Sequence, residues 1–202
     1  MYAFIGHCQK ERNCTIQTCG RKIINFRQFW KYLKNKAHLI DTNMTEELEV
    51  SKQPKRIPKY LGLEDSIRLL MEVEYSPRNY CIITLFLNCA LRLSELVSLN
   101  IEQIDSEKVS VIGKGDRQRQ IYLNPAAKKA VYNWLSVREY YKPKDNALFV
   151  SMRGTRMHQR TIQEMLAKVV KSAGLPNDIT PHKLRHTLLL CSISMGTWIS
   201  GL

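Results

Sequence analysis

The chain has 202 residues, enough for one full domain and a fragment of a second, and its 44% of hydrophobic residues exclude a disordered or fibrous protein. Thirty-one lysines and arginines stand against eighteen aspartates and glutamates, which leaves a formal net charge of +13. Because so much like charge repels itself in a compact chain, this balance favours a polyanionic partner, most often a nucleic acid.

The first predicted helix spans residues 15–38, where apolar side chains recur every three or four positions and basic side chains occupy the other faces. A single helix of this kind needs partner helices, so we assign residues 1–50 to part of a small helical domain. Residues 51–59 contain four basic residues and two prolines and are predicted to be an extended linker. This linker is either a solvated connector or a segment that lies along a phosphate backbone.

Beyond the linker, the pattern predicts short helices over residues 63–73 and 93–99. Between them, residues 78–89 are almost wholly apolar, which predicts a central buried helix. We expect part of the apolar surface of this central helix to be left uncovered.

The periodicity then changes from helical to alternating. Residues 108–112 and 117–123 alternate between apolar and polar side chains, and the glycines of residues 113–116 supply a turn, so this region predicts a β-hairpin. The elements expected after the hairpin are three helices and one brief strand, namely a helix from residue 125, a strand at 147–150, a helix at 159–173 and a helix from 180. The predicted fold is therefore mainly α with a small inserted β-sheet, an α+β class.

Five residues from three separate parts of the sequence suit the chemistry of a phosphodiester: Arg92, Glu95, Lys114, His182 and Arg185. Two guanidiniums can bind a phosphate through paired hydrogen bonds and neutralise charge that develops on it. A histidine exchanges a proton near neutral pH, and a lysine can protonate a departing alkoxide. Each residue has an ordinary alternative role: an Arg-x-x-Glu pair is usually a surface ion pair, and a lysine in a Gly-Lys-Gly turn is usually a turn residue.

The order of these residues and their local sequences resembles the tyrosine recombinase, or phage integrase, family of Xer-like site-specific recombinases. The arginine box of the family corresponds to residues 90–96, its lysine hairpin to 113–116, and its His-x-Leu-Arg-His motif to 182–186. The resemblance extends over nearly all residues from 58 to 187. The departure within these motifs is Ala90, at a position where the family prefers glycine.

The resemblance implies a tyrosine-recombinase catalytic domain over residues 60–202. It also implies that residues 1–50 are part of a core-binding, SAM-like helical domain that clamps DNA. The implied partner is double-stranded DNA, together with other recombinase protomers, and no metal or other cofactor is implied.

The resemblance also implies a role for each candidate residue. Arg92 and Arg185 would clamp the scissile phosphate and stabilise its pentacoordinate transition state. His182 would act as a general base or hydrogen-bonding partner. Lys114 would protonate the 5′-oxygen leaving group, and Glu95 would orient its neighbours.

The nucleophilic tyrosine of the family has no counterpart in this sequence, because all nine tyrosines precede His182. Without a nucleophile no 3′-phosphotyrosyl intermediate forms in cis, so we expect a C-terminally truncated recombinase that binds DNA but is inactive alone. Three alternatives stay open. Another protomer supplies the tyrosine and the chain is an enzyme, the chain regulates a full-length recombinase, or it is a non-functional product of a frame change soon after Thr187.

The cysteines and the uncharged C-terminal stretch bear on the compartment. The six cysteines have irregular spacing without a C-x2-C pair, and no secretory leader is recognisable, which predicts reduced thiols in a cytoplasmic protein. A zinc site formed by His7, Cys8, Cys14 and Cys19 is the alternative reading of the N-terminal cluster. Residues 187–202 are too few to cross a bilayer, so no membrane partner is expected.

Overall fold

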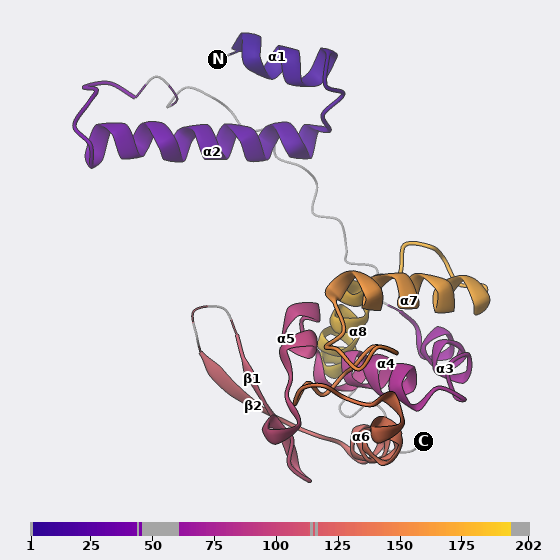
Figure 1. Cartoon of the computed structure of the whole chain (residues 1–202). Coiled ribbons are helices and arrows are strands. Elements are labelled where there is room, and N and C mark those ends of the chain that lie inside the picture. The colour runs from indigo at the N-terminus through magenta and orange to yellow at the C-terminus, as the bar shows by residue number, and fades with distance from the viewer. Residues whose placement is uncertain (1, 44, 46–60, 114, 116, 195–202) are drawn as a thin grey trace. The chain divides into compact units, whose positions relative to one another are not determined.

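The computed structural model describes residues 2–43, 45, 61–113, 115 and 117–194. The chain divides into two compact units, Met1–Ile57 and Pro58–Leu202 (Figure 1). The predicted linker, residues 51–59, lies outside the described residues. Within the described part of the chain, no helix is both long enough and apolar enough to cross a membrane.

The first unit contains two helices that pack against each other, α1 (Tyr2–Lys10) and α2 (Ile16–Asn35) (Figure 1). The start of α2 is capped by Thr15, whose side chain accepts a hydrogen bond from the backbone N–H of Thr18 at 3.3 Å. This helix matches the one predicted from the apolar periodicity.

The helix α1 was not predicted. Gly6 lies at its centre and lowers the helix propensity of a segment that is short. Packing supplies the missing stability, because Cys8 of α1 is buried together with Cys19 and Ile23 of α2. The first unit is therefore more helical than the sequence pattern indicates.

The second unit is mainly helical, and its helices are α3 (Leu63–Met71), α4 (Pro77–Cys89), α5 (Leu93–Ser98), α6 (Pro125–Arg138), α7 (Gln159–Ser172) and α8 (Pro181–Ser194). Two short 3-10 helices, η1 and η2, lie at Ile101–Gln103 and Glu139–Tyr141. The hairpin consists of β1 (Lys108–Ile112) and β2 (Gln118–Tyr122), which pair antiparallel with Val111 opposite Arg119. The predicted fold class, mainly α with a small β-sheet, is confirmed.

The helix α4 forms the centre of the second unit. Its residues 81–87 and Cys89 are all buried, as expected for a helix that is apolar on every face. The helix packs most extensively against α6 and α8. The expectation that its apolar surface stays uncovered is wrong, because these two helices enclose it.

The strand predicted at residues 147–150 is not formed. The segment is buried, but it makes only isolated β-bridges. Side chains satisfy two of its carbonyl groups, since Arg138 donates to Ala147 O at 2.6 Å and the indole of Trp134 donates to Leu148 O at 2.9 Å. An apolar run of four residues does not by itself distinguish a strand from a buried loop.

Ala90, which follows α4, has a left-handed backbone with φ 46° and ψ 38°. A residue with a Cβ pays about 1 kcal/mol or more in this region, whereas glycine does not. We expect Ala90→Gly to raise the free energy of unfolding by up to about 1 kcal/mol, less the part offset by the extra freedom of glycine in the unfolded chain.

Urea unfolding of Ala90→Gly measures this gain. The matched control is Ala167→Gly on the exposed face of α7, where the helical backbone makes glycine unfavourable by about 1 kcal/mol. Equal losses of stability in the two variants would contradict the assignment of strain to Ala90.

Candidate functional site

Arg92 and Glu95 meet at the start of α5. The carboxylate of Glu95 accepts hydrogen bonds from the backbone N–H of Arg92 at 2.8 Å and from its guanidinium at 2.7 Å. The side chain of Glu95 is 3% exposed, whereas that of Arg92 is 50% exposed. The buried acid therefore holds the arginine at the surface of the helix start, where the helix dipole also favours a carboxylate.

A third member of this cluster, Arg119 of β2, was not predicted from the sequence. Its guanidinium donates two hydrogen bonds to the carboxylate of Glu95, at 2.7 and 2.8 Å. The alternation of β2 could have indicated this role, because Arg119 shares the inward, half-buried face of the strand with Ile121. A charge on that face requires a partner of opposite sign.

Arg185 approaches the same carboxylate from α8. Its Nη1 lies 3.7 Å from Oε2 of Glu95, and the side chain is 18% exposed. This Nη1 atom is buried and has no hydrogen-bond partner among the described residues. Burial, followed by the positive charges of Arg92 and Arg119, lowers the pKa of Arg185 below its ordinary value.

His182 and His186 lie one helical turn apart on α8. Their Nε2 atoms are 2.9 Å apart and their rings are nearly perpendicular, at 89°. In this contact one imidazole donates and the other accepts. His182 was a predicted site residue, whereas His186 is an addition from the structure.

A cavity of about 510 Å³ brings these groups together at the junction of α5, α7 and α8. Arg92, His182 and Arg185 line it, while Glu95 lies behind the two arginines. The other lining residues are Leu91, Leu93, Ser94, Gln159, Gln163, Thr180, Pro181 and His186. Lys114, the remaining predicted site residue, lies outside the described residues.

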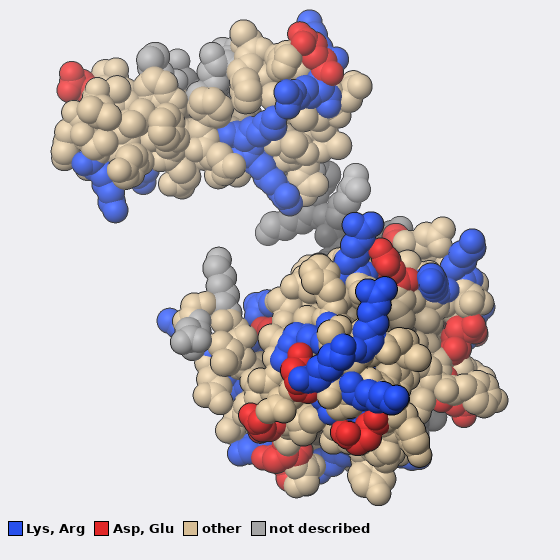
Figure 2. All heavy atoms as spheres, viewed as in Figure 1, with Lys and Arg blue, Asp and Glu red and all other residues tan. Residues whose placement is uncertain are grey.

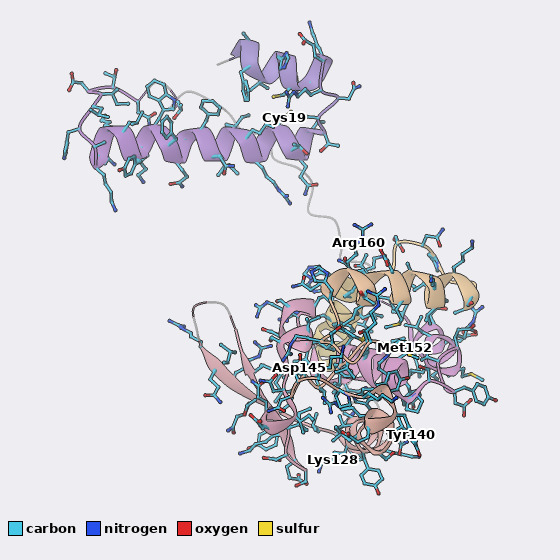
Figure 3. All side chains as sticks on the ribbon, in the orientation of Figure 1. Cys19, Lys128, Tyr140, Asp145, Met152 and Arg160 are labelled. Atoms are coloured by element: carbon cyan, nitrogen blue, oxygen red, sulfur yellow. The ribbon has the colours of Figure 1, made fainter. Side chains whose placement is uncertain are left out.

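Basic side chains lie on the surface of the second unit. Figure 2 shows lysine and arginine side chains extending across the face of the second unit that is turned to the viewer. Arg160 of α7, for example, points away from the body of the unit and is 82% exposed (Figure 3). Among the residues that the structure describes, no three histidine, cysteine or acidic side chains are arranged to hold a metal ion.

The ionisation of Glu95 is set by its arginine neighbours. Burial opposes the charged form, but the hydrogen bonds from Arg119 and Arg92 outweigh burial and lower the pKa of Glu95 to about 2. The same hydrogen bonds to Glu95 raise the pKa of Arg119. The cluster is therefore charged throughout the neutral and mildly acidic range.

This pKa predicts acid-dependent stability. Because the pKa of Glu95 in the folded chain, about 2, lies below the value near 4.5 of an unperturbed carboxyl, its contribution is complete above about pH 4.5 and is lost as pH falls toward 2. The loss amounts to about 3 kcal/mol. We expect Glu95→Gln to be less stable than wild type at pH 7 and this difference to close on acidification. Urea unfolding between pH 7 and pH 2 checks this, and a difference that stays constant would contradict it.

Two solved structures of recombinases have the same fold as this chain. The crystal structure of XerA recombinase matches with a TM-score of 0.65 and 24% identity, covering 98% of this chain and 69% of that chain. XerH site-specific recombinase bound to palindromic difH substrate, in a post-cleavage complex, matches with a TM-score of 0.76 and 18% identity, covering 95% and 61%. The fold of the chain is therefore that of the tyrosine recombinase catalytic domain.

The family is established by sequence. Residues 59–195 match the phage integrase family, and the chain belongs to that family, as the motifs at the cavity predict. Tyrosine recombinase XerC of Caldanaerobacter subterraneus subsp. tengcongensis is 44% identical over 191 residues, covering 93% of this chain and 54% of the relative. Tyrosine recombinase XerC of Shewanella amazonensis is 40% identical over 167 residues, covering 80% and 56%. The chain spans about half the length of these curated relatives.

Proposed function

We propose that the second unit binds double-stranded DNA and holds one backbone phosphate in the cavity between α5, α7 and α8, as part of a recombinase that breaks and rejoins DNA. The observation that carries this proposal is the buried Nη1 of Arg185, which has no hydrogen-bond partner in the described part of the chain. A buried N–H of a cation is costly without an acceptor, and an anionic oxygen in the cavity provides one.

The neighbouring side chains fit a phosphate in the same position. Arg92 is half exposed and lines the cavity with Arg185, so two guanidiniums can donate to different oxygens of one phosphate. Charge that develops on these oxygens during phosphoryl transfer is stabilised by donors already in place. Glu95 holds Arg92 from behind the cavity by a hydrogen bond and lies 3.7 Å from Arg185.

His182 and Lys114 complete the proposed site. His182 lines the cavity, where its imidazole can accept or share a proton at the reacting phosphate. We assign to Lys114, which lies outside the described residues, the protonation of the departing 5′-oxygen. The roles proposed here are all carried by side chains, and the scheme includes no metal ion.

DNA binding is tested by the salt dependence of affinity. Arginine and lysine contacts release counterions, so affinity for a fluorescent duplex should fall about a thousandfold between 50 and 200 mM salt if some six phosphates are contacted. Anisotropy titrations measure this dependence. An affinity that does not change with salt would contradict a phosphate-binding surface.

The phosphate site itself is tested with inorganic phosphate. Titration of the isotope-labelled chain should shift the NMR signals of His182 and Arg185, and Arg185→Ala should weaken this binding about tenfold or more. The matched control is Arg160→Ala, which removes the same charge from an exposed position on α7. Equal effects of the two variants would place the phosphate elsewhere.

We further infer that these 202 residues bind DNA without cleaving it. No tyrosine lines the cavity within the described part of the chain, and no tyrosine follows His182 in the sequence. A duplex that traps covalent intermediates should therefore yield no protein–DNA adduct on a denaturing gel. A covalent adduct would show that a tyrosine reaches the phosphate.

A further inference from the structure

The acceptor positions of Glu95 are all used by two arginines. Arg92 donates to them through its backbone N–H and its guanidinium, and Arg119 donates through Nη1 and Nη2. A carboxylate offers about four lone-pair positions, so these four hydrogen bonds saturate it. Arg185 consequently stays 3.7 Å from Glu95, and its Nη1 makes no hydrogen bond.

We infer that Arg119 is a positioning residue of the anion site: it occupies two acceptor positions of Glu95 and so keeps Arg185 available to a phosphate. This inference rests on the proposed function. Without Arg119, the charge of Glu95 would be free to draw in the guanidinium of Arg185, which already lies within 4 Å of the carboxylate. A captured Arg185 would present fewer N–H groups to the cavity.

The hairpin is built to hold Arg119 in this place. Val111 pairs opposite Arg119 and is buried, so a slip of one residue in the pairing would expose Val111 and turn Arg119 away from Glu95. The hairpin is thus joined to the arginine cluster through one bidentate contact, from Arg119 to Glu95.

The test compares Arg119→Ala with Arg117→Ala, which removes the same charge from an exposed position two residues earlier. We expect Arg119→Ala to bind inorganic phosphate about tenfold more weakly than wild type, the effect of one charge-assisted hydrogen bond, and Arg117→Ala to bind like wild type. In Arg119→Ala, the guanidinium protons of Arg185 should exchange with water more slowly, because they now bond to Glu95.

A second substitution separates positioning from simple structural damage. Adding Glu95→Gln to Arg119→Ala removes the charge that captures Arg185, so phosphate affinity should recover toward the wild-type value. If Arg119 only stabilises the fold, the double variant will bind no better than Arg119→Ala. Arg119→Lys serves where the alanine variant fails to fold, since a lysine keeps the charge but not the planar, two-pronged contact.

The outcomes for the inference and for the proposed function are distinct. Phosphate affinity and Arg185 exchange that are unchanged in Arg119→Ala would overturn the role of Arg119 and leave the phosphate site standing. If wild type takes up no phosphate, the proposed function fails. Slower exchange of the Arg185 protons in Arg119→Ala would then still establish that Arg119 prevents capture of Arg185, and unchanged exchange would refute it.

Discussion

Replacement of Glu95 by alanine is expected to lower the free energy of unfolding of the second unit by about 3–5 kcal/mol, as for removal of one partner from a buried ion pair. The carboxylate is 3% exposed and is the shared acceptor of Arg92 and Arg119, with Arg185 close by. Its removal leaves three guanidiniums side by side with no anion between them. The repulsion between these guanidiniums and the loss of their hydrogen bonds both lower the free energy of unfolding.

Chemical denaturation at pH 7 measures this loss. The control is Glu164→Ala on α7, where the ion pair with Arg160 is exposed and is worth about 0.5 kcal/mol or less. We also expect added phosphate to recover part of the stability of Glu95→Ala, because the anion takes the place of the missing charge. A loss in Glu95→Ala no larger than the loss in Glu164→Ala would show that the cluster is not a unit.

The second large effect is expected at Gly154, in the turn that precedes α7. Its backbone has φ +77°, and a Cβ there would lie 2.1 Å from the carbonyl oxygen of Lys142. Gly154→Ala therefore combines the cost of a left-handed backbone with a clash against main chain that cannot rotate away. We expect a loss of about 3 kcal/mol, the sum of backbone strain and overpacking.

The control for this variant is Gly174→Ala. Gly174 also has a positive φ, +66°, but the nearest atom to an added Cβ is the end of the Arg68 side chain at 3.7 Å. This variant pays only the backbone strain, about 1 kcal/mol. Thermal unfolding of both variants separates the cost of the clash from the cost of the backbone strain. Similar melting temperatures would rule out the clash with Lys142.

The helices were largely predictable because their signals are local. The apolar run at residues 78–89 corresponds to α4, and Pro125 opens α6 at the first turn, where a missing N–H costs nothing. Gly174 ends α7 with the positive φ that glycine adopts freely. The hairpin followed from alternation on both sides of a glycine-rich turn.

Other features depend on contacts between residues far apart in the sequence. Residues 147–150 form no strand, because the buried side chains of Arg138 and Trp134 satisfy carbonyls that a neighbouring strand would otherwise bond. The helix α1 forms because α2 packs on it, despite Gly6. In both cases packing overrides the local preference.

The sequence alone determined the basic charge and the phage integrase family. It also supplied the candidate residues Arg92, Glu95, His182 and Arg185. Only the tertiary structure decided how they are partnered. The bond from Arg119 to Glu95 spans 24 positions and exists because one strand register turns Arg119 inward. Periodicity in the sequence indicates which face of an element is buried. Which guanidiniums bond to a carboxylate depends on interatomic distances, and these are set by the packing of the tertiary structure.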